Sequence, residues 1–457
     1  MCGYGKPATR LLSLIVLLGW ASAGAQPPGH PPSLSYAGPS DEARDGSPQS
    51  LSVTVGKRFT IREAGEGEFL IHPILSHLAD GKLLLRSSPD SDIVDEEQFA
   101  TASTDGGNSW KTVPDWPMNN GAGRHIRQVH TLLPDGRSLV VSAYLVSTGQ
   151  ENKYILPAYI SSQDGVSFSR IDSVPFQFHV GKVADFQDPA EWPTMKRGGP
   201  KPGTPNFHID QGKPSQLMSE FRAEYGKKWL IGLVSMLYPL DDSTLLAFVY
   251  VSTELDETSK RHRFVAVCLE STDWGRSWAV RSVPGPWDPA LEKKNRREKP
   301  LDGFCEPSVT RLRNGGHLIV MRIGAWQRLY SARSTDGCRT WSKPKEISVF
   351  GILPTVLTLP DGVLALCTGR PDNTLSFSVD DGESWPWTLR LLDQTNPDHP
   401  STRNNTMIQV APGRLLYVYD YGYRRPDAGV NVPHAIEGVF VDVSMVPQIL
   451  EVPDRHQ

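Results

Sequence analysis

The sequence has few cysteines and no motif that binds a metal or a nucleotide. Five cysteines occur among 457 residues, and none has the CxxC spacing of a zinc site. There is no His-x-x-x-His pattern, no EF-hand loop and no glycine-rich phosphate loop between a strand and a helix. We therefore expect no metal and no cofactor. Four cysteines lie on or beside predicted strands, where we expect mostly buried thiols and allow for one disulfide: Cys268, Cys305, Cys338 and Cys367.

The sequence also lacks an excess of charge of either sign. It has 47 Lys and Arg against 51 Asp and Glu, for a net charge of −4. This balance offers neither the basic surface that binds nucleic acid nor an acidic tail. We therefore expect no nucleic acid among the partners of this protein.

Only one apolar run is long, and it lies at the N-terminus. Residues 11–20, LLSLIVLLGW, follow Lys6 and Arg10 and precede the small-x-small sequence Ala23-Gly-Ala25. The run is too short to span a bilayer, and this pattern is typical of a secretory signal peptide. We expect residues 1–25 to be removed and the mature chain to be secreted or periplasmic, with no membrane span.

Two repeats organise the rest of the chain. Residues 26–50 are rich in Pro, Gly and Ser and predict a flexible leader. From residue 51 onward, short apolar runs alternate with turn signals, which favours many short antiparallel strands. The first repeat has the form Ser-x-Asp-x-Gly-x-x-Trp or a near relative: STDGGNSW (103–110), SQDGVSF (162–168), STDWGRSW (271–278), STDGCRTW (334–341) and SVDDGESW (378–385).

The first repeat is best interpreted as a structural turn between two strands. Its Asp can accept bonds from backbone amides, its Gly permits a positive φ, and its aromatic residue packs beneath the turn. The second repeat is an apolar strand, a DG-like turn and another apolar strand, as in EPSVTRLRNGGHLIV, and it occurs six times. Five of the six copies are followed by the first repeat.

The two repeats together predict an all-β fold. Each unit supplies four antiparallel strands, and six units make a six-bladed β-propeller of four-stranded antiparallel blades over residues 51–450. Residues 51–62 are expected to supply the strand that closes the ring on the sixth blade. The aspartate turns at blade spacing resemble the Asp boxes, or BNR repeats, of the sialidase superfamily, whose members are six-bladed propellers. A segment at 173–226 interrupts the pattern, and we expect it to form a wall or lid on the pocket face.

Strand topology predicts where a site would lie. The starts of the first strands and the ends of the second strands share one face, near the central axis, where propeller ligands usually bind. The residues eight positions before each DG-like turn form one column: His72, Arg127, Val234 or Leu233, Glu306, Leu353 and Asn404. Four of these six positions are polar or ionisable, and such residues are costly to bury without a function. The same face should receive the flanking and second-strand residues Arg322, Arg370, Tyr419 and Arg403, with His130 nearby.

The resemblance to sialidases assigns roles to some of these residues. Glu306 and Arg322 match that family's glutamate and the arginine on the following strand, and Asp90 and Asp92 lie in the loop where it keeps its acid/base aspartate. The family's first arginine is replaced by Ile71, with His72 beside it. Its nucleophilic tyrosine is replaced by Asn404, with Tyr419 on the neighbouring strand.

We expect a secreted, monomeric, exo-acting glycoside hydrolase that cleaves a terminal acidic sugar from a glycan or polysaccharide. The predicted catalytic residues are Glu306, Asp92, Asp90, Tyr419 and His72, and the predicted substrate-binding residues are Arg322, Arg127, Arg370, Arg403, Asn404 and His130. Two carboxyl groups would flank the scissile bond, and guanidinium groups would hold an acidic sugar. Two alternatives remain open: a polysaccharide lyase that acts on uronates, since His72, His130 and Tyr419 suit proton abstraction, and a carbohydrate-binding propeller without activity.

Overall fold

The computed structural model describes most of the chain between residues 50 and 446. The described residues are 33–36, 50–65, 70–78, 81–88, 99–113, 128–142, 145–148, 150, 153–163, 167–177, 232–252, 263–288, 290–291, 301–324, 326–392, 404–425 and 430–446.

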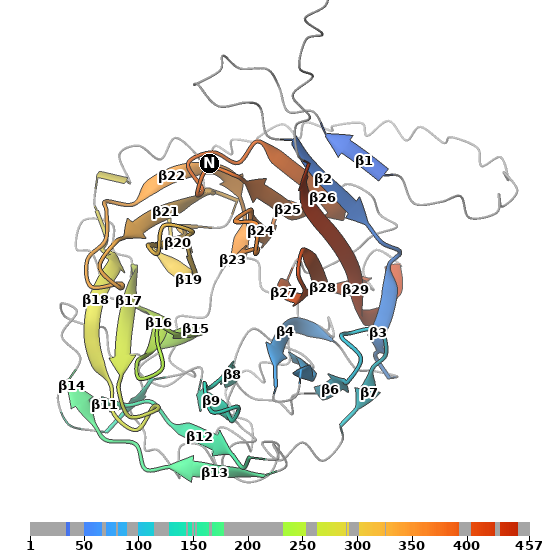
Figure 1. Ribbon diagram of the computed structural model, residues 1–457. Helices are drawn as coiled ribbons and strands as arrows, with labels where there is room; N and C mark the ends of the chain where they lie inside the picture. The colour runs from blue at the N-terminus through green and yellow to red at the C-terminus, as the bar shows by residue number, and fades with distance from the viewer. Residues whose placement is uncertain are drawn as a thin grey trace, which may run out of the picture.

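Six sheets are arranged as blades around a central axis, so the predicted six-bladed β-propeller is confirmed (Figure 1). The first three blades comprise β4 (Ile71–His77), β5 (Leu83–Ser88), β6 (Phe99–Ser103) and β7 (Lys111–Thr112); β8 (Gln128–Leu132), β9 (Ser138–Ser142), β12 (Ala158–Ser161) and β13 (Phe168–Ile171); and β15 (Gly232–Pro239), β16 (Leu245–Ser252), β17 (Phe264–Ser271) and β18 (Ala279–Gly285). Blades four and five comprise β19 (Cys305–Arg311), β20 (His317–Arg322), β21 (Arg328–Ser334) and β22 (Lys345–Phe350); and β23 (Ile352–Thr358), β24 (Leu364–Gly369), β25 (Asn373–Ser378) and β26 (Trp387–Leu392).

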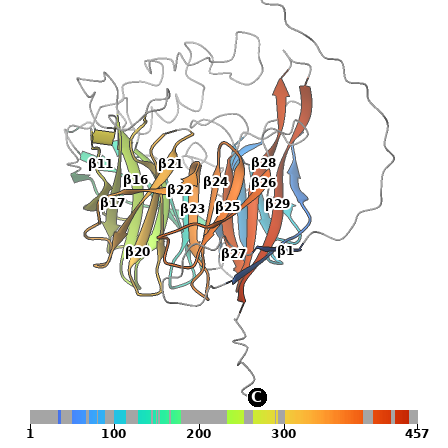
Figure 2. The same cartoon turned by 90° about the horizontal axis from the view of Figure 1, so that it is seen from above.

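The sixth blade joins the two ends of the propeller. It contains β27 (Asn405–Ala411), β28 (Arg414–Arg425) and β29 (Val430–Val446), and β29 also pairs with β2 (Ser50–Val55) and β3 (Phe59–Glu63). The prediction that residues 51–62 close the ring is therefore confirmed. β1 (Ser33–Tyr36) pairs with β2, and a small sheet of β10 (Val146–Ser147), β11 (Lys153–Ile155) and β14 (Phe176–Gln177) lies beside the second blade. In side view, β28 and β29 extend together beyond the other strands on one face (Figure 2).

The core lies between the blades. Side chains alternate along each strand, so neighbouring residues of one strand pack against opposite blades. In β16, Leu245, Ala247 and Val249 join a cluster with the second blade, whereas Leu246 and Phe248 join a cluster with the fourth. Both faces of this strand are buried, which explains why its sequence is apolar without alternation.

The aspartate turns have the predicted structural role. In the first, the Asp105 carboxylate accepts hydrogen bonds from the Ser109 N–H at 2.9 Å and the Ser109 hydroxyl at 2.5 Å. Gly107 has φ +92, and the Trp110 indole N–H donates to its carbonyl at 2.9 Å. The hydrogen bonds from Ser109 and Ser103 lower the pKa of Asp105 to about 2. The carboxylate is thus fully used within the turn.

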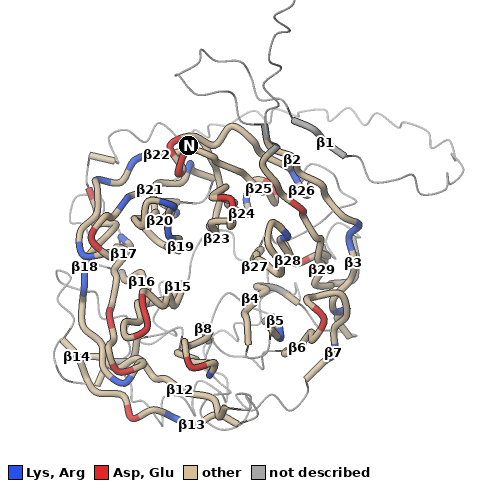
Figure 3. Tube along the Cα trace, in the orientation of Figure 1, with Lys and Arg blue, Asp and Glu red and all other residues tan. Residues whose placement is uncertain are grey.

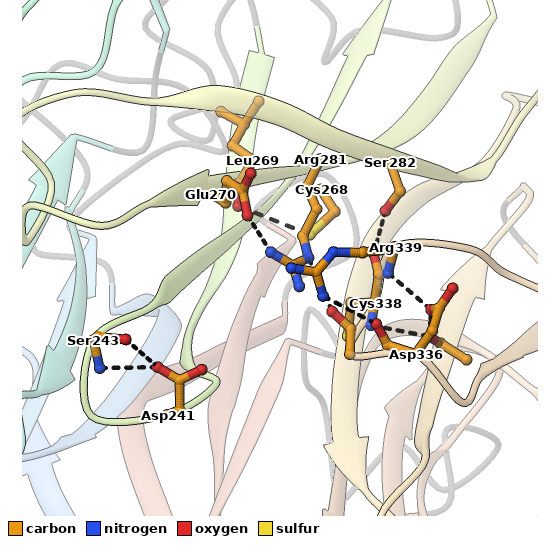
Figure 4. Close-up of polar contacts among 12 residues, drawn as sticks. Asp241, Ser243, Cys268, Leu269, Glu270, Arg281, Ser282, Asp336, Cys338 and Arg339 are labelled. Atoms are coloured by element: carbon orange, nitrogen blue, oxygen red, sulfur yellow. Dashed lines mark hydrogen bonds and ion pairs between the residues drawn. The ribbon is translucent and has the colours of Figure 1, made fainter.

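These turns also join neighbouring blades (Figure 4). On β18 of blade three, Arg281 Nε donates to the Gly337 carbonyl of the next aspartate turn at 2.9 Å, and the Ser282 hydroxyl donates to the Cys338 carbonyl at 2.6 Å. Arg281 also forms an ion pair with Glu270. Hydrogen bonds from one blade to the aspartate turn of the next blade fix the spacing between the two blades.

The four described cysteines are buried and free, as expected for most of them. Charged residues of both signs are distributed around the ring (Figure 3). Among the described residues, no helix is long and apolar enough to cross a membrane.

Candidate functional site

The first strands of all six blades surround the axis, and each contacts the first strands of its neighbours: β4, β8, β15, β19, β23 and β27 (Figure 1). Antiparallel pairing places the start of each first strand beside the end of the second. Cys305 pairs with Arg322, Ile352 with Gly369, and Asn405 with Tyr419. The described residues of the predicted column therefore lie at one end of the blades, around the axis.

Three residues of this column share an unusual backbone conformation. His72, Glu306 and Leu353 have φ values of 52°, 51° and 47°. Each precedes a proline, and the register of each first strand shifts at that point. Side chains other than glycine are strained in this region, typically by about 1–3 kcal/mol, and such strain gathers at functional sites. The repeated X-Pro dipeptide was the signal in the sequence that could have predicted this feature.

Glu306 and Arg322 form the centre of the site. Arg322 Nη1 donates to Glu306 Oε1 at 2.5 Å, and the Leu353 N–H of the fifth blade donates to Glu306 Oε2 at 2.6 Å. Arg322 Nη2 donates to Asp302 Oδ2 at 2.6 Å. Both ends of the guanidinium are thus held by carboxylates of the protein, and both oxygens of Glu306 accept hydrogen bonds.

The three side chains are largely shielded from water but still reach it. The exposed fractions are 11% for Glu306, 17% for Arg322 and 27% for Asp302. Burial alone would lower the pKa of Arg322, but the charges on Glu306 and Asp302 outweigh it and raise that pKa well above its ordinary value. Two carboxylates against one guanidinium leave this centre with a net negative charge.

Asp302 was missed by sequence reasoning. It lies in the connection that enters the fourth blade, four residues before Glu306, where Asp302-Gly303 has the form of a turn signal and no strand pattern marks the aspartate as a site residue. An acidic residue this close to the predicted glutamate, in LDGFCEP, was the one signal available.

Other predicted residues lie at the same end of the blades. Arg370 directly follows β24, is partly exposed and has φ 52°. His72 is partly buried at the start of β4. Asn404 is 3% exposed, and its carbonyl accepts the Asp420 N–H at 3.2 Å.

Tyr419 points into the core rather than toward water. It has no exposed surface and packs in the apolar cluster between blades five and six. Its hydroxyl donates to Glu437 Oε2 at 2.6 Å, and burial together with Glu437 raises its pKa above the ordinary value. Sequence reasoning did not find Glu437, which faces Tyr419 from β29.

His130 is also buried. It lies two residues inside β8 and is 9% exposed. Burial first, and the positive charge of Arg86 second, hold the pKa of His130 well below its ordinary value. The structure thus places a neutral imidazole beside a buried arginine of the neighbouring blade.

Comparison with known proteins supports the repeat and the fold. Residues 261–423 match the BNR repeat-like domain family. The chain is a six-bladed β-propeller, and this part of it is similar to that repeat family. The predicted resemblance to the sialidase superfamily is therefore confirmed at the level of repeat and fold.

Solved structures share the propeller fold of this chain. A protein of unknown function from Dyadobacter fermentans has 18% identity and a TM-score of 0.57 over 86% of this chain and 99% of its own. A mutant α-L-arabinofuranosidase from Fusarium graminearum, in complex with an iminosugar inhibitor, has 14% identity and a TM-score of 0.52 over 84% of this chain and 97% of its own. An intramolecular trans-sialidase from leech has 14% identity and a TM-score of 0.46 over 86% and 70%. No curated protein matches the sequence. At 18% and 14% identity, the Dyadobacter and Fusarium structures show that the fold is shared and nothing about activity.

Several predicted site residues lie outside the described part of the chain. They are Asp90, Asp92, Arg127 and Arg403, and most of the segment 173–226 is outside as well. Within the described part of the chain, no group of three or more His, Cys, Asp or Glu side chains could hold a metal ion. The described residues of the site carry carboxylate, guanidinium and imidazole groups: Glu306, Asp302, Arg322, Arg370 and His72.

Proposed function

We propose that this six-bladed β-propeller is a secreted glycoside hydrolase that releases a terminal sugar from a glycan or polysaccharide. One observation carries the proposal. Glu306 lies where β19 begins, near the central axis, and is largely shielded from water. One of its carboxylate oxygens accepts a hydrogen bond from Arg322 and the other from the Leu353 N–H. A carboxylate held in one orientation at a strained backbone position suits attack on an anomeric carbon or activation of water.

Glycoside hydrolysis needs a second carboxyl group to protonate the leaving oxygen. Asp90 and Asp92 remain our candidates for this acid, and His72, at the start of the first blade, is a further candidate. The α-L-arabinofuranosidase with this fold cleaves glycosides, which supports a hydrolase but does not transfer its substrate to this chain.

The acidic nature of the sugar is the finer part of the proposal. Because Asp302 and Glu306 occupy both ends of Arg322, a sugar carboxylate has to be bound by other arginines. Arg370 directly follows β24, the second strand of the fifth blade, at the end of the blades where Glu306 lies, and Arg127 and Arg403 are predicted for the same face. Asn404 would contribute at the start of the sixth blade.

A screen of the purified chain on neutral and acidic glycans tests the proposal, with reducing sugar and unsaturated product measured separately. We expect reducing sugar without ultraviolet-absorbing product, and we expect Glu306→Gln to lower kcat by roughly a thousandfold or more. Glu346→Gln is the matched control, since Glu346 is half-exposed and pairs with Arg328 on the outer strands of the same blade. An unsaturated product would show a lyase instead. Binding of a glycan with no turnover, unchanged in Glu306→Gln, would show a binding protein.

A further inference from the structure

We infer that Asp302 is a positioning residue of this site, which orients Arg322 so that Arg322 holds Glu306 in its working position. The inference rests on the proposed function, in which Glu306 is catalytic. Asp302 itself does not touch the reacting atoms; it acts through the guanidinium.

The contacts form a continuous chain across two blades. Asp302 Oδ2 accepts from Arg322 Nη2 at 2.6 Å, Arg322 Nη1 donates to Glu306 Oε1 at 2.5 Å, and Glu306 Oε2 accepts the Leu353 N–H at 2.6 Å. Charge-assisted hydrogen bonds of this length are the strong ones in proteins. A planar guanidinium held at both ends by separate carboxylates cannot rotate about its long axis without breaking one of them.

The backbone fixes Asp302 from both sides. Its N–H donates to the Ile323 carbonyl at 2.7 Å, and its carbonyl accepts the Phe264 N–H of the third blade at 2.8 Å. Gly303 follows with φ +95, and a Cβ there would lie 2.4 Å from the nitrogen and oxygen of Phe264. Only glycine fits this close approach, so the position of Asp302 is set by the packing of blade four on blade three.

A buried arginine secures the residue before Asp302. Arg263 Nη1 donates to the Leu301 carbonyl at 2.9 Å, and the guanidinium lies over the Trp287 ring at 5.0 Å. Arg263 is 2% exposed. Burying a charge is costly, and here it is used to hold the short segment that carries Asp302.

Removing the Asp302 carboxylate should release one end of Arg322. The guanidinium could then turn to bind Glu306 with both nitrogens, which would rotate the Glu306 carboxylate away from the Leu353 N–H. A displacement of about 1 Å at a reacting group can cost about a hundredfold in rate. Substrate affinity depends on other residues and should change little.

Kinetics of Asp302→Asn on the glycan selected by the screen test the inference. We expect kcat to fall by about tenfold to a hundredfold with KM within about threefold of the wild type, and Asp302→Glu to recover most of the rate. The melting temperature should stay within about 3 °C of the wild type, which separates positioning from loss of folding. Glu346→Gln, which removes a carboxylate from an exposed ion pair on the same blade, should keep wild-type kinetics.

A wild-type kcat in Asp302→Asn would overturn the inference, and so would a loss that Asp302→Glu does not recover. If the wild type cleaves no glycan, the proposed function fails, and a crystal structure of Asp302→Asn decides the inference separately. We expect the guanidinium turned and the bond from Leu353 to Glu306 lost. An unchanged Arg322–Glu306 geometry in that structure would overturn the positioning role.

Discussion

Buried charged and titratable side chains lie near the central axis, at the end of the blades where the candidate site is, and between neighbouring blades. Arg86 and Arg263 are each 2% exposed, and Arg322 is held by two carboxylates. His130 is neutral because burial and the charge of Arg86 both oppose its protonation. These residues stabilise the folded chain only while their charge states match their surroundings.

His130 should make stability depend on pH. Its pKa is lowered in the folded chain but is about 6.5 in the unfolded chain, so below that pH the unfolded chain binds a proton that the folded chain does not. The contribution of His130 is therefore complete above pH ~6.5 and is lost as pH falls, with a slope of at most about 1.4 kcal/mol per pH unit.

Urea unfolding at pH 7.5 and pH 5.5 measures this contribution. His130→Gln should show a pH-dependent loss smaller than that of the wild type by about 1 kcal/mol. Leu132→Ala, which changes an exposed side chain of the same strand and removes no titratable group, is the control and should keep the pH dependence of the wild type. Equal pH dependence in wild type and His130→Gln would show that His130 takes up a proton in the folded chain.

At the scale of single elements, the aspartate turn was the most predictable feature. Its Ser, Asp, Gly and Trp are all within eight residues, so every contact that defines it is local in sequence. The pair of Glu306 and Arg322 was also predictable, because the two residues lie symmetrically about the Asn314 turn of one hairpin. The direction of the Tyr419 side chain was not predictable, because alternation along a strand does not show on which face of the blade a given residue lies.

The turn at the fifth blade offers a test of this structural role. Asp380 accepts hydrogen bonds from the Ser378 hydroxyl at 2.7 Å and from the Ser384 N–H and hydroxyl at 2.9 and 2.6 Å. The neighbouring Asp381 carbonyl accepts from Arg333 of blade four at 2.8 Å. Asp380→Ala should lower the free energy of unfolding by roughly 1–3 kcal/mol, measured by chemical denaturation.

Glu383→Ala is the control for charge removal within the same turn. Glu383 is 60% exposed and pairs with Arg333 at 3.0 Å, so its loss should cost less than about 1 kcal/mol. Equal effects of the two substitutions would mean that the aspartate acts only through its charge.

At the scale of the whole molecule, the ring brings distant segments together. β2 and β3, near residue 50, complete the blade that ends at residue 446, and the Leu353 amide of blade five meets Glu306 of blade four. The sequence predicted the number of blades because each repeat carries its own signals. Contacts between two blades, such as the Leu353 N–H with Glu306 or Arg281 with the Gly337 carbonyl, have no such local signal, and they arise only from the packing of complete blades.

Our central proposal is that the sugar binds and reacts where β19 begins, beside Glu306. A crystal structure of Glu306→Gln with the glycan selected by the screen tests this most directly. We expect the anomeric carbon of the terminal sugar within about 3.5 Å of the side chain of residue 306, with Arg370 in contact with the same sugar. A sugar bound on the outer strands, remote from Glu306, Arg322 and Arg370, would contradict the account.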